Sequence, residues 1–581
     1  MTVQILSICM FVTTFAFLLF GFPVAFTLAG TAILFALTAS FFGFMSVDFL
    51  ALIPSKIFGT MTNELLVAVP LFIFMGLILE KSKIAQELLE TIANLFGKLR
   101  GGLGFTVIIV GALLAASTGI VGATVVTMGL LTLPTMLKWG YDKKLASGLI
   151  CASGTLGQII PPSIALILLS DVLQGAYSQS QLLQGKIPSN PISTIDLFAG
   201  AILPGVLLVI LYCLWLQIII YLKPQYAPLI ISKGKKYTLK KTLSIIFLPI
   251  ILIIFVLGSI LMGIATPTEA ASFGAIGAIV LSFIKNSFSL KVLNKAILDT
   301  TKISSMIFLI LISAKIFSLV FIGLEGREIL TSFINQIPGG VIGAMLFTMI
   351  LIFVLGFFLD FIQIVFTIIP IIGPILLQMD INPLWLGIMI AVNLQTSFLT
   401  PPFGFALFYL RGVAPPSVKT LHIYRGVIAF ILLQLAGLAI AGYFPALVNY
   451  MPKRIYLTSE NAPPPVNPKL QVCLEDFIFN VYDTETDLLR SGVQTAKGLD
   501  ISYIPEKHQK RLTEAHERVL ATFGLVENVR NAEKELASFI VEYRPLHKKV
   551  RFLQKKIKFV EIDIKDMERT IRRLENSGET T

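Results

Sequence analysis

Charge is what this sequence has least of. Only 14% of its 581 residues are Asp, Glu, Lys or Arg, whereas 55% are hydrophobic and the mean hydropathy is +0.83. A soluble domain cannot bury that much apolar surface, so most of the chain must be solvated by lipid. Apolar runs of about 20 residues, enough for a membrane span, recur as far as about Pro445. No basic segment with a small-residue cleavage site precedes the first run, so we expect that run to be retained.

Residues that perform covalent or metal chemistry are equally scarce. The four cysteines are Cys9, Cys151, Cys213 and Cys473. They are scattered and form no C-x-x-C pair, so neither a disulfide framework nor a metal site is indicated. The four histidines all lie in or near polar segments, which disfavours an intramembrane hydrolase: His422, His508, His516 and His547. No G-x-x-x-x-G-K-[ST] loop for ATP is present. The sequence therefore predicts a protein that is not an enzyme and has no cofactor.

The net charge of +12 comes from basic residues in short loops between apolar runs. These loops are Lys81–Arg100, Lys138–Lys144, Lys223–Lys241, Lys285–Lys302 and Arg411–Arg425. Basic loops of this kind mark the cytoplasmic side of a membrane protein, so the charge indicates orientation and not binding of nucleic acid.

The apolar runs divide into ten single spans and two longer runs. We expect the single spans at 5–20, 22–43, 64–80, 145–170, 197–222, 243–264, 270–285, 303–323, 384–410 and 426–448. Runs 104–136 and 340–376 are too long for one span. If the basic loops all lie in the cytoplasm, run 104–136 enters and leaves the membrane on that side as a re-entrant hairpin. Run 340–376 then does the same on the opposite side, and both termini are periplasmic.

The two halves of the apolar region repeat the same features in the same order. Pro23 begins a span with Gly30 seven residues later, and Pro267 does the same with Gly274. In each hairpin a proline, Pro134 or Pro374, precedes a double proline by 27 residues, and these pairs are Pro161-Pro162 and Pro401-Pro402. Matching elements on opposite sides of the membrane are typical of inverted-repeat transporters. The predicted fold is an all-α polytopic membrane protein with two re-entrant hairpins and two broken helices.

Each double proline ends a helix inside the membrane and leaves carbonyl oxygens unpaired. Such oxygens are tolerable where they face a hydrated site and coordinate a small cation. Candidate residues at the breaks are Thr155, Gln158, Asn393, Gln395, Thr396, Ser397 and Thr400, and those at the hairpin tips are Ser117, Thr118, Gly119, Gly356 and Asp360. Half-helix N-termini at the breaks also favour an anionic substrate. Sodium and a carboxylate therefore fit this arrangement together.

A structural role is the alternative for each of these residues. Serine and threonine in membrane helices often bond their own backbone, and glycines allow close helix packing. Asp360 is either functional or a water-exposed tip residue. Lys315 either pairs with a carboxylate, snorkels or faces a cavity.

The composition changes sharply near Met451. Residues 453–581 hold 42 of the 80 charged residues. We therefore expect a permease domain at 1–451, with repeats at about 5–222 and 243–448, a linker and irregular segment at 452–505, and a helical tail at 506–581. The tail has a heptad seam formed by Val550, Leu553, Ile557, Val560, Ile564, Met567, Ile571 and Leu574. It either packs on itself as a helical hairpin or forms an intermolecular coiled coil, and it is a candidate for protein–protein contact.

Several stretches resemble the large membrane subunit of tripartite ATP-independent periplasmic (TRAP) transporters. These are GFPVAFTLAG, MGLLTLPTMLKWGYDKKLASGLICASGTLGQIIPPS, GIATPTEAASFGA, LGFFLD and LTPPFG, within about residues 5–450. The second is most similar to the mannitol or chloroaromatic branch. The resemblance implies an inner-membrane permease that imports an organic acid with sodium. It further implies a periplasmic binding protein that delivers substrate, a small four-helix membrane subunit, and an elevator mechanism.

The resemblance also implies two sodium sites, each between a hairpin tip and a helix break. The residues implied for the first site are Ser117, Gly119, Gly157, Ile160 and Pro162, and those for the second are Gly356, Ser397, Thr400 and Phe403. The chain departs from the family pattern in two places. The first tip reads A-S-T-G in place of A-S-G-S, and Ser397 replaces a common glycine, which leaves the ligating atoms open. Two alternatives to a tripartite permease are a stand-alone sodium-coupled carboxylate symporter and a membrane-embedded scaffold or enzyme.

Overall fold

The computed structural model describes the membrane part of the chain almost completely. It describes residues 2–82, 84–96, 99–119, 121–184, 192–229, 239–454 and 468–498, and in the tail 509, 512–513, 515–528, 530–531, 564 and 567–568. Every regular element among these residues is a helix, which confirms the all-α class. The chain forms two compact units, Met1–Asn461 with Asp566–Thr581 and Ala462–Lys565.

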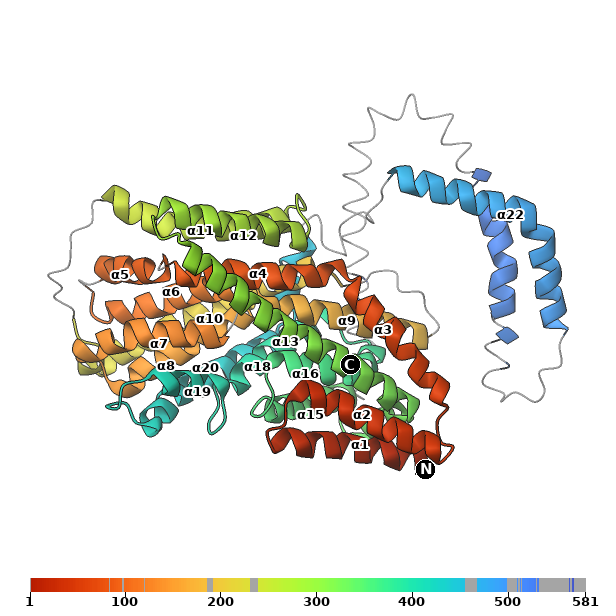
Figure 1. Cartoon of the computed structure of the whole chain (residues 1–581), viewed down its shortest axis with the longest axis horizontal. Coiled ribbons are helices and arrows are strands. Elements are labelled where there is room, and N and C mark those ends of the chain that lie inside the picture. The colour runs from red at the N-terminus through yellow and green to blue at the C-terminus, as the bar shows by residue number, and fades with distance from the viewer. Residues whose placement is uncertain are drawn as a thin grey trace, which may run out of the picture. The chain divides into compact units, whose positions relative to one another are not determined.

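The helices of the membrane unit follow the order of the two predicted halves (Figure 1). The first half contains α1 (Thr2–Leu19), α2 (Val24–Phe41), α3 (Leu52–Met61), α4 (Glu64–Lys81), α5 (Ile84–Phe96), α6 (Gly102–Thr118), α7 (Val121–Lys138), α8 (Lys143–Thr155), α9 (Ile164–Leu183) and α10 (Thr194–Leu222). The second half contains α11 (Leu239–Leu261), α12 (Pro267–Ile284), α13 (Leu290–Gly323), α14 (Gly326–Gln336), α15 (Gly340–Leu355), α16 (Phe361–Thr367), α17 (Ile369–Gln378), α18 (Pro383–Ser397), α19 (Phe405–Val413) and α20 (Thr420–Tyr443).

Many of these helices are long and apolar enough to cross a membrane. Among the described residues there are six such helices, or up to nine if each of three bent pairs counts as one span. Large apolar side chains such as Phe26, Phe58 and Ile254 are more than 60% exposed on this unit. Such surfaces are stable in lipid, so the helices form a polytopic membrane protein.

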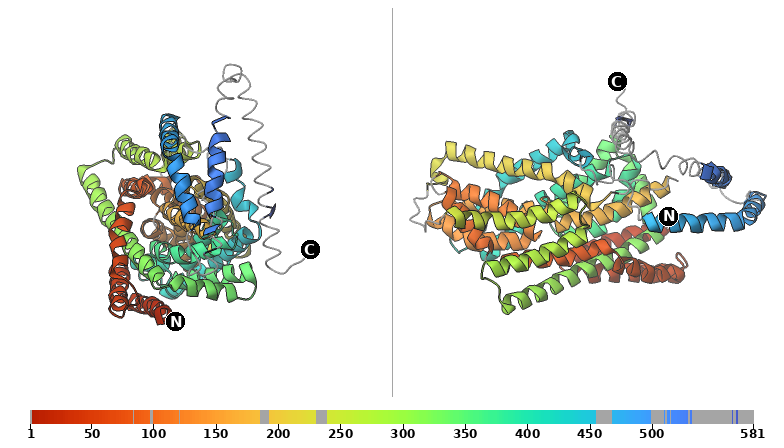
Figure 2. Two further views of the ribbon diagram at one scale, coloured as in Figure 1. Left: turned by 90° about the vertical axis from the view of Figure 1, so that its right-hand side faces the viewer. Right: turned by 90° about the horizontal axis from the view of Figure 1, so that it is seen from above.

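The packing of the helices confirms the internal repeat. Helix α4 of the first half corresponds to α13 of the second, and α2 corresponds to α12. Accordingly α4 packs on α12 just as α13 packs on α2, and α9 packs on α17 just as α19 packs on α7. Within each half, α1 packs on α2 just as α11 packs on α12. Figure 2 (right) shows most of these helices side by side and roughly parallel, as expected for a bundle that spans one layer.

The membrane unit is one compact body, in which we distinguish two groups of helices by their contacts. The scaffold group comprises α1–α4 and α11–α13, which contact one another through α2 with α13 and α4 with α12 and α13. The inner group comprises α6–α10 and α15–α20, in which α8 packs on α20, α9 on α17 and α7 on α19. Contacts between the groups include those of α4 with α6 and α9 and of α13 with α16. Helices α5 and α14 contact both groups.

Both predicted hairpins are present. Helices α6 and α7 meet at Gly119 and contact each other. The second hairpin begins with α15 and returns as α16 and α17, which are bent by 57° against each other. A short amphipathic helix precedes each hairpin, α5 in one half and α14 in the other, and α14 makes an angle of 119° with α15. Helix α5 occupies most of the range Lys81–Arg100, which was expected from the sequence to be a basic loop.

Both double prolines interrupt a helix, as expected. The first lies between the short 3₁₀ turn η2 (Leu156–Gln158), which continues α8, and the start of α9. The second lies between α18 and α19. Both Pro–Pro peptide bonds are cis. Ser163 accepts a hydrogen bond from the backbone N–H of Leu166 and so caps the start of α9.

Three further segments differ from the sequence-based expectations. The predicted basic loop Lys285–Lys302 is helical from Leu290, because Ser289 caps a 34-residue helix that continues into the next span. Residues 47–61, to which no element was assigned, form the 3₁₀ helix η1 (Val47–Ala51) and α3. Residues 468–497, within the segment expected to be irregular, form the 30-residue helix α22 (Pro468–Lys497). No proline occurs in α22 after its first residue, so nothing in its sequence breaks the helix.

In the tail unit, α22 packs against the helical residues 515–528. The ring of Tyr482 lies 5.7 Å from that of Phe523, and Arg530 forms an ion pair of 2.7 Å with Asp483. The heptad seam falls almost entirely outside the described residues, within which only Ile564 and Met567 belong to it. The seam therefore stays a prediction.

Candidate functional site

The tip of the first hairpin touches the first helix break. Gly119 has a φ of +61°, a conformation that glycine adopts without strain. A Cβ atom at this position would lie 3.1 Å from the backbone nitrogen of Ile164, the first residue of α9. The tip therefore lies at the N-terminus of the half-helix that follows Pro162, where unpaired N–H groups carry partial positive charge.

The tip of the second hairpin touches the second break in the same way. A Cβ atom on Gly356 would lie only 2.0 Å from the hydroxyl oxygen of Ser397, so the backbone of the tip packs directly on the end of α18. The ring of Phe358 at this tip lies 5.3 Å from the ring of Phe403, which follows the double proline. The structure thus brings together three residues of the second predicted sodium site: Gly356, Ser397 and Phe403.

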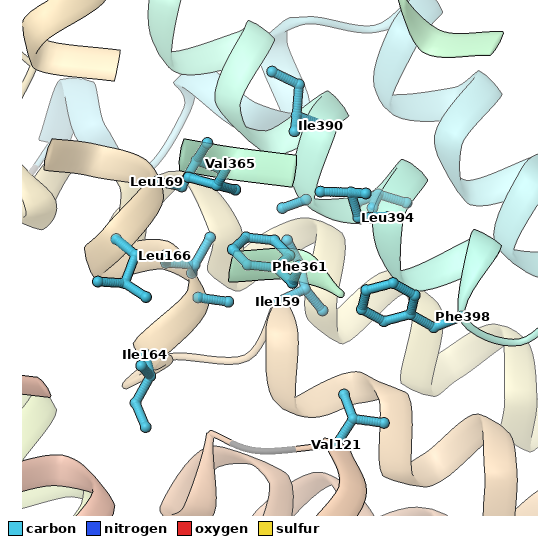
Figure 3. Packing of buried hydrophobic residues seen from close by; sticks show 14 of the residues in the cluster. Val121, Ile159, Ile164, Leu166, Leu169, Phe361, Val365, Ile390, Leu394 and Phe398 are labelled. Atoms are coloured by element: carbon cyan, nitrogen blue, oxygen red, sulfur yellow. The ribbon is translucent and has the colours of Figure 1, made fainter. Parts of the chain in front are cut away.

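The two breaks and the two hairpins share one apolar core (Figure 3). The labelled side chains of this core come from the start of α7, the first break, α9, α16 and α18: Val121, Ile159, Ile164, Leu166, Leu169, Phe361, Val365, Ile390, Leu394 and Phe398. Helix α18 contacts both η2 and α9, and α19 contacts α8. The broken helices therefore lie against each other, as a shared pocket between them requires.

Four of the predicted hydroxyls at the breaks donate hydrogen bonds to backbone carbonyls three or four residues earlier in the chain. The pairs are Thr155 to Ala152 (2.9 Å), Thr396 to Val392 (2.8 Å), Ser397 to Leu394 (2.8 Å) and Thr400 to Thr396 (2.8 Å). This is the local bonding that the structural alternative predicts. It does not prevent ligation, because a hydroxyl that donates its hydrogen keeps its lone pairs free for a cation. The side chains of Ser117 and Thr118 lie outside the described residues.

Several polar atoms near the breaks are buried without a hydrogen-bond partner. They are the hydroxyl of Ser153 and the amide oxygens of Gln158 and Gln434. The buried side chain of Gln395 lies beside the hydroxyl of Tyr212. The nitrogen of Gln434 donates to Thr155 (3.2 Å) and to the hydroxyl of Tyr212 (2.7 Å), which ties the end of α8 to α20 and α10. Because an unpaired buried polar group costs about 1–3 kcal/mol, this cluster is suited to a bound ion, polar substrate or water.

Other predicted residues have defined structural partners. Asp360 caps α16 by accepting a bond of 2.9 Å from the backbone N–H of Gln363. Asn393 donates to the carbonyl of Met349 (2.8 Å) and so ties α18 to α15. Ile160 packs toward Gly205 of α10. Gly157 and Pro162 are buried in the first break, where only their backbone carbonyls are available as ligands.

The oxygens at the two breaks are neutral carbonyls, hydroxyls and amides. Among the described residues, no three His, Cys, Asp or Glu side chains lie close enough to hold a metal ion. Neutral oxygens suit a weakly held monovalent cation better than a zinc or iron ion. Two members of the buried cluster, Tyr212 and Gln434, were missed in the sequence. A glutamine inside an otherwise apolar span, ILLQLAGLAIAG, is the signal that identifies Gln434.

Comparison with known proteins identifies the family. Residues 11–447 match the family model described as "Tripartite ATP-independent periplasmic transporter, DctM component". The chain belongs to this family. It is therefore a large permease subunit of a TRAP transporter, a multi-pass inner-membrane protein and a transporter rather than an enzyme. Membership of a tripartite family implies a small membrane subunit and a periplasmic binding protein as partners.

Named relatives match most of the membrane part of the chain. A C4-dicarboxylate TRAP transporter large permease of Rhodobacter capsulatus is 28% identical over 440 residues, 75% of this chain and 96% of the relative. A sialic acid TRAP transporter large permease of Vibrio cholerae is 26% identical over 74% of this chain and 95% of its own length. An isethionate TRAP transporter permease of Oleidesulfovibrio alaskensis is 29% identical over 74% of this chain and 64% of its own length.

A solved structure supports the fold. The Alcanivorax borkumensis YdaH transporter, whose crystal structure is described as having an unusual topology, superposes with a TM-score of 0.52. The match covers 69% of this chain and 90% of that transporter at 14% sequence identity. This likeness concerns the arrangement of helices alone.

Proposed function

We propose that this TRAP permease imports an organic acid together with sodium. The observation that carries the proposal is the contact of each hairpin tip with one helix break, Gly119 with Ile164 and Gly356 with Ser397. Backbone carbonyls lie at both breaks and the Ser397 hydroxyl lies beside Gly356, so a sodium ion bound there would join a tip to a break. Half-helix N-termini beside the same breaks favour an anion.

The names of the relatives support an anionic substrate. C4-dicarboxylates and sialic acid carry carboxylates, and isethionate carries a sulfonate, so each relative is named for an organic anion. A carboxylate remains the substrate class that we propose here. Assignment to the mannitol or chloroaromatic branch rests on sequence resemblance only.

We propose an elevator movement as the mechanism. The scaffold group stays fixed while the inner group, which carries both hairpins and both breaks, moves across the membrane with its ions and substrate. In this scheme sodium favours the loaded inner group because it bridges tip and break. The movement therefore draws its energy from the sodium gradient.

The test of sodium binding does not require the identity of the substrate. An ion that binds only the folded state raises the thermal midpoint as its concentration rises. We expect the purified permease with its small subunit to melt at a higher temperature in NaCl than in choline chloride of equal ionic strength. Equal midpoints in the two salts would remove sodium from the proposal.

The test of coupling uses proteoliposomes. With the complete transporter and its binding protein, we expect uptake of radiolabelled C4-dicarboxylates, isethionate or sialic acid only under an inward sodium gradient. Uptake of the same compounds without any binding protein would favour a stand-alone symporter, the alternative that family membership disfavours. Transport of none of them would place the substrate outside these classes.

We also propose that both termini lie in the periplasm, as the basic loops predict. The tail would then be placed to contact the binding protein or the small subunit, which we expect to have four helices. A variant that retains Cys473 as its only cysteine tests this orientation. A membrane-impermeant maleimide should label it in intact spheroplasts, and labelling only after lysis would place the tail in the cytoplasm.

A further inference from the structure

A polar contact outside the candidate site joins the two helix groups. The amide nitrogen of Asn63, just before α4, donates a hydrogen bond of 2.6 Å to the carboxylate of Asp171 on α9. The amide oxygen of Asn63 accepts from the backbone N–H of Leu65 at 3.0 Å and caps α4. Both ends of the amide are therefore in use, which fixes its orientation toward Asp171.

A lysine on α13 acts on the same carboxylate. Lys315 is the charged side chain that faces the Asp171 carboxylate from α13 without forming an ion pair with it. Lys56, an exposed residue of α3, is the other charged group that acts on Lys315. Asp171 and Lys315 are both largely shielded from solvent. Charges inside a membrane are costly, and those that persist are generally paired and functional.

This contact links the two helix groups and must break when one group moves against the other. Asn63 and Lys315 belong to helices of the scaffold group, and Asp171 belongs to α9 of the inner group. The inner group cannot move past α4 and α13 without separating Asp171 from both partners. Separation breaks the hydrogen bond between Asn63 and Asp171 and moves the half-buried carboxylate away from the opposite charge of Lys315, and both changes are unfavourable inside a membrane.

We propose that Asp171, Asn63 and Lys315 form a latch that holds the two helix groups in the arrangement seen here. The latch rests on the proposed elevator movement and adds to it a specific barrier between states. It opens when the inner group moves, and its strength sets how often the unloaded permease leaves this arrangement. Asp171 is a positioning residue in this scheme, because it acts through its hydrogen bond to Asn63 on the arrangement of the helices.

The experiment measures the position of α9 against α3 directly. Spin labels are placed at Met61→Cys and Leu182→Cys, which are 74% and 66% exposed, in a variant whose four native cysteines are replaced. Distances are measured by double electron–electron resonance in nanodiscs, in choline chloride and in NaCl. With the latch intact we expect one dominant distance in choline chloride. Asp171→Asn and Lys315→Met should each at least triple a second, shifted population.

The double variant Asp171→Asn/Lys315→Met separates a latch from a merely structural role. If the single variants act only by leaving one buried charge unpaired, removal of both charges restores the wild-type distances. A latch stays open in the double variant, so the shifted population should persist. Lys291→Met, which removes an exposed charge from the same helix α13, is the matched control and should leave the distances unchanged.

Three outcomes would overturn the latch, and the first two differ in what they say of the elevator. If NaCl shifts the distance in the parent protein while neither single variant changes it, the elevator stands and the latch is wrong. If no salt condition and no variant changes the distance, α9 does not move against α3, and both the elevator and the latch are wrong. Restoration of the parent distances in the double variant also refutes the latch.

Discussion

Gly356 and Ser397 are in direct contact across the second helix break. The nearest heavy atom to an ideal Cβ on Gly356 is the Ser397 hydroxyl oxygen at 2.0 Å, followed by the Ser397 Cβ at 2.8 Å. A distance below 3 Å cannot be accommodated without movement, so glycine is required for this approach. The tip of the hairpin and the end of α18 are therefore matched to each other, and the Ser397 hydroxyl lies at their contact.

Replacement of Gly356 by alanine should separate the tip from α18. We expect a destabilisation of about 1–3 kcal/mol from overpacking and a loss of most of the extra thermal stability conferred by NaCl over choline chloride. Melting curves of the purified protein in both salts measure the two effects. Gly30→Ala is the control, because nothing lies within 4 Å of a Cβ there. A sodium effect that survives in Gly356→Ala would mean that the tip does not contribute to ion binding.

Replacement of Thr400 by alanine should weaken sodium binding without unfolding the protein. The hydroxyl already satisfies its hydrogen through Thr396, so its removal costs little structurally but deletes a candidate ligand. We expect about a fivefold rise in the sodium concentration for half-maximal stabilisation, equivalent to roughly 1 kcal/mol. Thr38→Ala removes the same type of bond, to Leu34, from an exposed helix face and should have no such effect. Equal sodium dependence in both variants would exclude Thr400 from the site.

The sequence predicted the elements that obey strong local rules. Double prolines cannot continue a helix, so both breaks were predicted from the residues alone, and glycine at position 119 marked the first tip. The helical start of α13 was not predicted. Residues 290–302 are basic and were assigned to a loop, but the cap at Ser289 and the ion pair of Lys81 with Asp299 (2.7 Å) belong to a helix that extends beyond the apolar region.

Contacts between residues far apart in the chain could not be predicted. Asn63 and Asp171 are 108 residues apart, and Gln434 and Thr155 are 279 apart. Neither pair lies in a shared motif, and without periodicity a single polar residue in an apolar run does not identify its partner. The approach of Gly356 to Ser397 is a further case, since the sequence shows a glycine and a serine but not that they meet. The proposed ligands stay predictions for the same reason.

Replacement of Tyr212 by phenylalanine should destabilise the inner group. The phenol accepts a hydrogen bond of 2.7 Å from Gln434 in a fully buried position, while its ring packs edge-on against Phe430 at 5.3 Å. Phenylalanine keeps the ring contact and removes the acceptor, which should cost about 1–3 kcal/mol. The melting midpoint of the purified protein measures this loss. Tyr221→Phe changes an 84% exposed residue on the same helix and serves as the control. If both variants melt alike, the buried bond contributes nothing.

Helix α22 and the helical residues 515–528 form a hairpin in the tail unit. Replacement of Arg530 by alanine should loosen this tail hairpin at neutral pH. The guanidinium bonds Asp483 at 2.7 Å and lies over the rings of Phe479 (4.8 Å) and Tyr482 (5.9 Å), so one side chain fastens α22 to the following helix at three points. Because the ion pair is exposed, we expect only a few-fold faster hydrogen exchange in α22 of the full-length protein. Lys497→Ala, which removes an exposed charge from the end of α22, should leave exchange unchanged.

Acidification should have the same effect as the arginine variant. The hydrogen bond from Arg530 holds the pKa of Asp483 below its ordinary value of 3.8. A depressed folded-state pKa means that the contact stabilises the hairpin above the unfolded pKa and that this stabilisation is lost as the pH falls through the folded value. Exchange in α22, corrected for the intrinsic pH dependence of amides, should therefore accelerate below about pH 3.8 in the parent protein. It should accelerate less in Asp483→Asn, which has no carboxylate to protonate. An identical acid response in both proteins would show that other groups control the opening of the hairpin.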